Sequence, residues 1–141
     1  MPTGASDDEV VAQVLARYQL AVATGDRRQF ASVFHPDATV SYPDPHTSVL
    51  VTATGTAFAD EVATMVEAGT PVKEETVELH IDVSGTVAVA RVDFFLRLGD
   101  ESFVGTDFFS LAKLGDAWFI VQKLYDMSPS GDPESEQPAT S

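Results

Sequence analysis

Residues 75–125 read ETVELHIDVSGTVAVARVDFFLRLGDESFVGTDFFSLAKLGDAWFIVQKLY, and their pattern is the strongest indication of the fold. It contains four runs rich in Val, Phe and Ile, residue types that are enriched in β-strands. Turn residues separate the runs at Ser84-Gly85, Gly99-Asp100 and Gly115-Asp116. Short turns between consecutive strands predict an antiparallel meander. Its strands are expected at residues 75–83, 86–98, 102–113 and 117–125.

Before residue 75 the apolar spacing changes to that of helices. Apolar residues three and four positions apart predict helices at residues 7–23, 26–34 and 56–67. Asp7 or Asp8 can cap the first helix, Gly25 can end it, and Asp26 can cap the second. A short strand is expected at residues 38–42, followed by an irregular loop from Asp44 to Gly55.

Three helices and a wide antiparallel sheet predict an α+β domain. The sheet is wide enough to curl around the helices and leave a cone-shaped cavity between the two layers, where binding sites are favoured. With 141 residues, of which 44% are hydrophobic, the chain has the size and composition of one globular domain. We expect the domain to span residues 1–127. Residues 128–141 have almost nothing apolar and are expected to form a disordered acidic tail.

The charge and residue types exclude several classes of function. The formal net charge of −14 argues against nucleic acid and against an anionic membrane as partner. The chain has no cysteine, so disulfides, thiolate nucleophiles and Cys-ligated zinc are excluded. Three scattered histidines and the lack of a Gly-rich phosphate loop predict neither a metal site nor a cofactor. The polar N-terminus is unlike a secretory signal, and a cytoplasmic location is expected.

Residue parity along the strands selects candidate site residues. Asp107 shares its strand face with Phe103, Phe109 and Leu111, so this acid is expected on a half-buried apolar surface. In the preceding strand, parity leaves the orientation open. Arg91, Asp93 and Phe95 share one face, while the opposite face is wholly apolar.

Several segments carry a family resemblance. The opening of the chain, with Arg17-Tyr18, Gly25-Asp26 and residues 34–40, resembles ketosteroid isomerases. Residues 81–85, 107–111 and 118–123 resemble the lumazine-binding subgroup of the same superfamily, the nuclear transport factor 2-like proteins. The likeness covers about residues 7–125 and implies their fold, a cone-shaped curved sheet wrapped around three helices.

The isomerase resemblance implies roles for individual residues. Tyr18 matches the tyrosine that donates a hydrogen bond to the dienolate oxygen, and Asp107 matches the partner acid that stays protonated in an apolar site. Tyr42 stands where the isomerases have their proton-shuttling aspartate. Tyrosine is far too weak an acid to replace a carboxylate base, and this departure argues against steroid isomerisation.

A second resemblance is to limonene-epoxide hydrolases. Arg91-Val92-Asp93 matches their Arg-x-Asp, which works with an aspartate on the last strand to protonate an epoxide and activate water. That last aspartate is replaced by Lys123 in this chain. The resemblance implies that the face with Arg91, Asp93 and Phe95 points inward.

These observations favour a cofactor-independent acid/base enzyme that acts on a small apolar molecule by isomerisation, dehydration, cyclisation or epoxide opening. Tyr18 and Asp107 would stabilise a developing oxyanion, and Asp93, oriented by Arg91, would be the base. The expected substrate-binding residues are Tyr42, Lys123, Phe95, Phe109, Phe58 and Tyr125. The alternatives are a non-catalytic module that binds a flat ring compound and a dimerising accessory domain.

Purely structural roles for these residues also remain open. Tyr18 can be a core tyrosine, Arg91 and Asp93 can be a surface pair, and Lys123 can extend its amine to solvent. For assembly, Trp118, Ile120, Gln122 and Leu124 share one face of the last strand. We expect this stripe to point outward and to form a homodimer through the outer face of the sheet.

Overall fold

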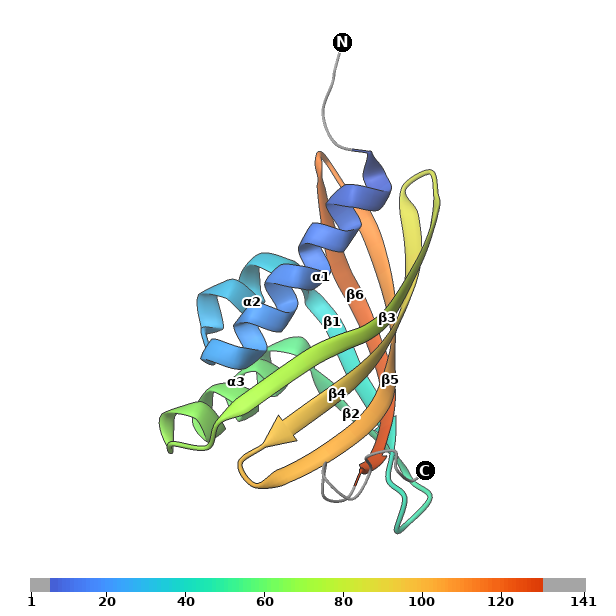
Figure 1. The fold of residues 1–141 in the computed structure, drawn as a ribbon. Coiled ribbons are helices and arrows are strands. Elements are labelled where there is room, and N and C mark those ends of the chain that lie inside the picture. The colour runs from blue at the N-terminus through green and yellow to red at the C-terminus, as the bar shows by residue number, and fades with distance from the viewer. Residues whose placement is uncertain (1–5, 131–141) are drawn as a thin grey trace.

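Three helices lie on the concave face of a six-stranded, curved and unclosed sheet (Figure 1) in a computed structural model that describes residues 6–130. The helices are α1 (Asp7–Thr24), α2 (Arg27–Val33) and α3 (Gly55–Glu67). The strands are β1 (Phe34–Pro43), β2 (Leu50–Thr54), β3 (Val72–Ser84), β4 (Val87–Leu98), β5 (Glu101–Leu114) and β6 (Ala117–Pro129). The sheet order is β2-β1-β6-β5-β4-β3, and only the β1–β6 pair is parallel among these strands. The α+β class and the curved sheet are confirmed.

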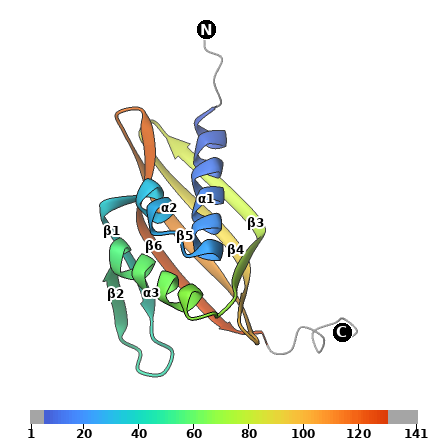
Figure 2. The same ribbon diagram turned by 90° about the vertical axis from the view of Figure 1, so that its left-hand side faces the viewer.

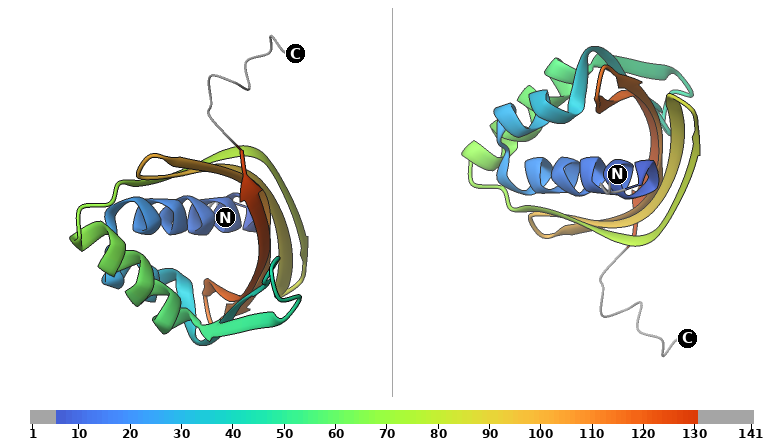
Figure 3. Two further views of the ribbon diagram at one scale, coloured as in Figure 1. Left: turned by 90° about the horizontal axis from the view of Figure 1, so that it is seen from below. Right: turned by 90° about the horizontal axis from the view of Figure 1, so that it is seen from above.

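The sheet curves around α1, which lies inside the concave layer (Figure 3). Val11, Val14, Leu15 and Tyr18 are the buried residues of its inward face up to the middle of the helix. They meet inward-facing apolar residues of β4 and β5, which include Val92, Phe109 and Leu111. No helix in the described part of the chain is long and apolar enough to cross a membrane.

Local capping sets where the helices begin and end. Ser6, rather than Asp7 or Asp8, caps α1 in a capping box with Glu9. Gly25 ends this helix in the left-handed conformation (φ 65°), and an added Cβ there would lie 2.8 Å from the Val66 side chain. Asp26 caps α2 as expected, accepting hydrogen bonds from two backbone N–H groups. Glycine at position 25 therefore lets α1 and α3 approach closely.

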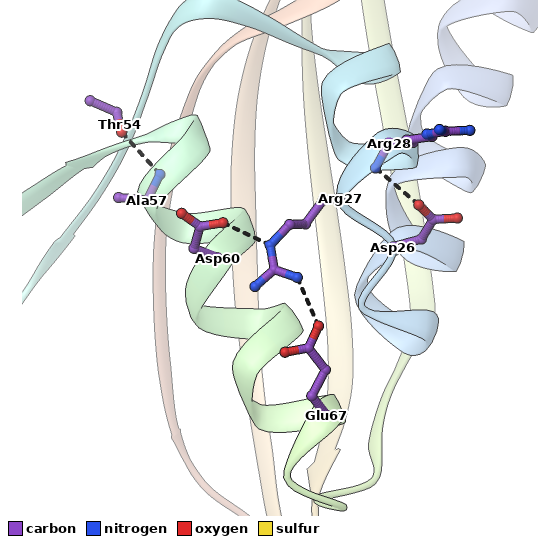
Figure 4. Close-up of polar contacts among 7 residues, drawn as sticks. All are labelled: Asp26, Arg27, Arg28, Thr54, Ala57, Asp60 and Glu67. Atoms are coloured by element: carbon purple, nitrogen blue, oxygen red, sulfur yellow. Dashed lines mark hydrogen bonds and ion pairs between the residues drawn. The ribbon is translucent and has the colours of Figure 1, made fainter.

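Arg27 connects the two short helices on the surface (Figure 4). Its guanidinium lies 2.9 Å from Asp60 and 2.8 Å from Glu67, both on α3. All three side chains are about half exposed, so water screens these ion pairs and they contribute little to stability. The contacts link α2 to α3 at the surface.

Two boundaries differ from the sequence-based expectation. The loop expected from Asp44 to Gly55 contains strand β2, which pairs antiparallel with β1 through partners such as Tyr42 and Val51. A tight turn brings the two strands together, closed by hydrogen bonds from the Asp44 N–H to the Val49 carbonyl and from the Ser48 N–H to the Asp44 carbonyl. At the other end, β6 continues to Pro129, so the first two residues of the expected tail pair with β5. Residues 131–141 of that tail lie outside the described residues.

A β-bulge in β6 overturns the expected outward stripe. Leu111 pairs with Ile120 while its neighbour Ser110 pairs with Gln122, so Val121 is an extra residue. An extra residue reverses the alternation of side chains along the strand. Trp118 and Ile120, before the bulge, and Lys123, after it, are therefore all buried on the inner face. Gln122 and Leu124 remain exposed on the outer face.

Candidate functional site

A cavity of about 830 Å³ lies between the helices and the inner face of the sheet. Its walls are mainly apolar and aromatic, with contributions from Val22, Phe58, Val62, Met65, Phe94, Leu96 and Phe103. The turn from Pro43 to Ser48 and Pro129 also line it, at one end of the sheet. A cavity of this size and composition is typical of sites for small organic molecules.

Three polar side chains of the cavity wall lie close to one another. Tyr18 from α1, Glu74 from β3 and Lys123 from β6 line the cavity. Asp107, on β5, is fully buried next to them, with one carboxylate oxygen (Oδ1) 3.7 Å from the Lys123 ammonium nitrogen. This distance is that of an ion pair rather than a hydrogen bond. We call these four residues, Tyr18, Glu74, Asp107 and Lys123, the polar cluster.

Lys123 is the cation of the polar cluster, and aromatic rings surround its ammonium group. Its nitrogen lies 4.1 Å from the ring centre of Tyr125, 4.5 Å from that of Phe58 and 5.4 Å from that of Tyr18. The side chain is only 5% exposed. Electron-rich ring faces and the nearby carboxyl group compensate the charge in this apolar place. Lys123 therefore does not reach out to solvent.

Glu74 is the group of the cluster best suited to exchange protons near neutral pH. Burial and the neighbouring Asp107 raise the pKa of Glu74 from its ordinary 4.5 to about 7, while Lys123 and Gln19 act in the opposite direction. One carboxylate oxygen of Glu74 has no hydrogen-bond partner. A carboxyl group with a pKa near the ambient pH can serve as general acid and as general base.

The other two members of the cluster, Asp107 and Tyr18, also have pKa values above their ordinary range. Burial raises the pKa of Asp107, as expected, although the Lys123 ammonium opposes this. Burial also raises the pKa of Tyr18, whose hydroxyl oxygen has no hydrogen-bond partner. The Tyr18 hydroxyl therefore stays protonated and can donate a hydrogen bond to a molecule in the cavity.

Sequence reasoning missed Glu74 because the strand that corresponds to β3 was expected to start at residue 75. The strand begins at Val72, which is buried, and Glu74 shares its face. The two-residue spacing between Val72 and Glu74 was the available indication.

Arg91 and Asp93 lie on the outer face of the sheet, so the inward orientation implied by the epoxide hydrolase resemblance is wrong. Val92 is the residue of β4 that pairs with Asp107 and shares its inner face. The Arg91 guanidinium instead packs on the Phe108 ring at 5.6 Å. Asp93 accepts hydrogen bonds from Thr106 and Arg91, and these contacts lower its pKa. The wholly apolar face of β4 is the core face.

The remaining predicted site residues divide between the cavity, the core and the surface. Tyr42, Phe58 and Tyr125 line the cavity. Phe109 is buried in the core, with its ring 5.3 Å from that of Tyr18. Phe95 lies on the outer face with Arg91, beside the Arg97 guanidinium. Within residues 6–130, no group of His, Asp and Glu side chains could hold a metal ion.

Comparison with known proteins places the fold. The family described as "Putative lumazine-binding" matches residues 6–126. A nuclear transport factor 2-like protein of unknown function from Shewanella baltica OS155 is 25% identical, with a TM-score of 0.73 over 92% of this chain and 100% of that chain. No curated protein sequence matches the chain.

Two further solved structures share the fold at lower identity, and both come from Novosphingobium aromaticivorans. A "Putative Scytalone Dehydratase" is 15% identical, with a TM-score of 0.73 over 86% of this chain and 84% of that chain. A "putative aromatic ring hydroxylase" is 19% identical, with a TM-score of 0.68 over 92% of this chain and 96% of that chain. With the family match over residues 6–126, the chain belongs to the lumazine-binding family of the nuclear transport factor 2-like superfamily.

Proposed function

We propose that the protein is an acid/base enzyme that moves a proton on a small, largely apolar molecule held in the main cavity. The observation that carries the proposal is the position of Glu74, a carboxyl group with a pKa of about 7 in the wall of a mainly apolar cavity. Tyr18 and Lys123 line the same cavity. The three side chains supply a proton acceptor, a hydrogen-bond donor and a positive charge.

These groups suit proton transfer next to a carbonyl group. The Glu74 carboxylate would take a proton from the carbon beside the carbonyl, and the electrons would move onto the carbonyl oxygen. The Tyr18 hydroxyl and the Lys123 charge would stabilise the resulting enolate. Return of the proton to another carbon isomerises the molecule, and loss of a neighbouring hydroxyl group as water dehydrates it. Asp107 would act through Glu74 and Lys123 as a positioning residue.

The test is exchange of carbon-bound hydrogen in deuterated water, with β-tetralone, a flat bicyclic ketone, as the probe. The protein is expected to speed the exchange of the protons next to the carbonyl group well above the buffer rate. Proton NMR follows the loss of their signal. An exchange rate equal to that of buffer, with saturable binding of the ketone, would contradict the enzymatic proposal.

A second candidate is a non-catalytic module that binds a flat ring compound. The family description favours it, and so do the rings of Tyr42 and Tyr125, which lie 5.2 Å apart in the cavity wall. Lumazine itself is fluorescent, so a titration of its emission with protein tests this candidate. Saturable lumazine binding without ketone exchange would favour the binding module over the enzyme.

We also propose a homodimer through the outer face of the sheet. The residues that would form its interface differ from the stripe expected from the sequence. Phe108 on β5 and Leu124 on β6 are directly paired there and are 50% and 42% exposed. Apolar surface of this kind is favourable to cover. Light scattering is expected to give twice the chain mass, and Phe108→Glu is expected to give a monomer. Leu20→Glu, on the exposed side of α1, is the matched control and should leave the dimer intact.

A further inference from the structure

A second, smaller cavity of about 150 Å³ lies between α1 and β3, which run side by side (Figure 2). We call it the side cavity. Tyr18 and Glu74 line the side cavity as well as the main one, so they form the wall between the two. The remaining lining residues are Ala12, Leu15, Ala16, Gln19, Thr76, Leu79, Val92 and Phe109.

The side cavity opens toward solvent at its outer end. Ala16 on α1 and Thr76 and Leu79 on β3 are lining residues that are exposed on the protein surface. At this outer end the Gln19 amide donates a hydrogen bond to the Thr76 hydroxyl. The opening lies between α1 and β3, whereas the turn from Pro43 to Ser48 lines the main cavity.

The inner end of the side cavity carries polar atoms suited to hold water. The Tyr18 hydroxyl oxygen and one Glu74 carboxylate oxygen are buried without a hydrogen-bond partner. Buried polar atoms are nearly always hydrogen-bonded to protein or to ordered water. A buried water needs two to four polar partners and roughly 10–15 Å³ of space, and the side cavity offers several times this volume.

We propose that the side cavity holds ordered water and gives Glu74 its own route to solvent, separate from the main cavity. A molecule in the main cavity covers Glu74 on one side only. The carboxyl group can therefore still exchange its proton: a carboxylate takes a proton from the adjacent water, and that water takes one from bulk solvent. This route does not depend on which reaction the main cavity serves.

The test is a carboxyl-carbon NMR titration of Glu74 in the unliganded protein. Ala12→Leu fills the side cavity and removes water from the carboxylate, and desolvation disfavours the charged form. We expect the pKa of Glu74 to rise by about 1, the order of magnitude for partial loss of hydration. Leu79→Ala widens the opening and should lower this pKa.

The charged and titratable groups that face Glu74 stay in place in both variants. They are Asp107 from β5, Lys123 from β6 and Tyr18 from α1. A change in pKa therefore reports hydration rather than a lost charged neighbour. Ala23→Leu, at an exposed position of α1 that lines neither cavity, is the control and should leave the pKa unchanged.

Opposite shifts in Ala12→Leu and Leu79→Ala support the side route. An unchanged pKa in both variants, or the same shift in Ala23→Leu as in Ala12→Leu, would overturn it. If Ala12→Leu fails to fold, the sign of the shift in Leu79→Ala decides alone, since this change only removes atoms at a half-exposed rim. Because no ligand is present, the result does not depend on whether β-tetralone is exchanged.

Discussion

Glu74→Gln is expected to slow the exchange of the β-tetralone protons by about 100-fold or more, the usual contribution of a general acid or base. Glutamine keeps the size of the side chain, but its amide cannot accept a proton from carbon near neutral pH. The wild-type rate should rise with pH through about 7, because the carboxylate form of Glu74 is the base. The variant should lose this rise. Proton NMR in deuterated buffers between pH 5 and pH 9 measures both effects.

The matched control is Glu75→Gln. This substitution in the next residue of β3 changes the charge by the same amount. The Glu75 side chain, however, is exposed and points to the other face of the sheet. Its exchange rate should equal that of the wild type. Equal rates in Glu74→Gln and Glu75→Gln would remove Glu74 from the mechanism. Unchanged lumazine binding in both variants would show that the cavity itself is intact.

Most of the fold could be predicted because its determinants are local. The turn pairs at Ser84-Gly85, Gly99-Asp100 and Gly115-Asp116 join the strands of the meander as expected, and each of these glycines has a positive φ that favours glycine. Asp26 caps its helix through its own side chain. Strand β2 was missed because an edge strand of five residues gains its structure from pairing with β1, not from its own composition.

The sheet faces were harder to predict because irregularities in strand pairing interrupt the alternation. One lies in β6 at Val121, another in β3 between Thr76 and Glu78, and a third in β1 between Phe34 and Thr39. A bulge shifts all later side chains of its strand to the opposite face, and nothing in a single strand's composition marks it. Trp118 lies before the Val121 bulge and is buried, whereas Gln122 and Leu124 lie after it and are exposed, although all three share one parity in the sequence. The inward orientation of Arg91 and Asp93 was implied by the epoxide hydrolase resemblance, and β4 pairs with β5 in unbroken register.

The sequence identified part of the polar cluster and missed its titrating member. Parity placed Asp107 correctly on an apolar face, and burial of this acid is confirmed. Lys123 was expected near the substrate from its place in the resemblance. Its enclosure by Tyr18, Phe58 and Tyr125 depends on contacts between α1, α3 and β6, which only the folded chain brings together. Glu74 depends on the same long-range packing.

Lys123→Met is expected to destabilise the fold by about 3 kcal/mol or more at pH 8, the order of magnitude for removing one partner of a buried ion pair. Methionine keeps the length and apolar stem of lysine, so the aromatic packing is retained. What is lost is the positive charge that compensates Asp107 and Glu74. Urea unfolding measures the effect. Lys113→Met, in which a partly exposed lysine loses an ion pair with Asp7, should cost less than about 1 kcal/mol.

The destabilisation should depend on pH. Both buried carboxyl groups have pKa values above their ordinary range in the folded protein, so the folded state binds more protons than the unfolded state. Stability therefore falls as pH rises from about 4.5, where the unfolded glutamate releases its proton, to about 7, where folded Glu74 does. Without Lys123 the folded pKa values rise further, which extends this fall to higher pH. The cost of Lys123→Met should be small at pH 4 and largest at pH 8.

The double variant Lys123→Met/Asp107→Leu separates charge from packing. If the cation acts by compensating Asp107, then the two changes together cost less than the sum of the single changes, because the double variant leaves neither an uncompensated cation nor an uncompensated Asp107. If Lys123 acts only by filling space, the single costs add and Lys123→Met costs the same at pH 4 and pH 8. The second outcome would also weaken the proposed role of Lys123 toward an enolate, since a charge that does not act on the carboxyl group 3.7 Å away would not stabilise a substrate oxygen in the same cavity.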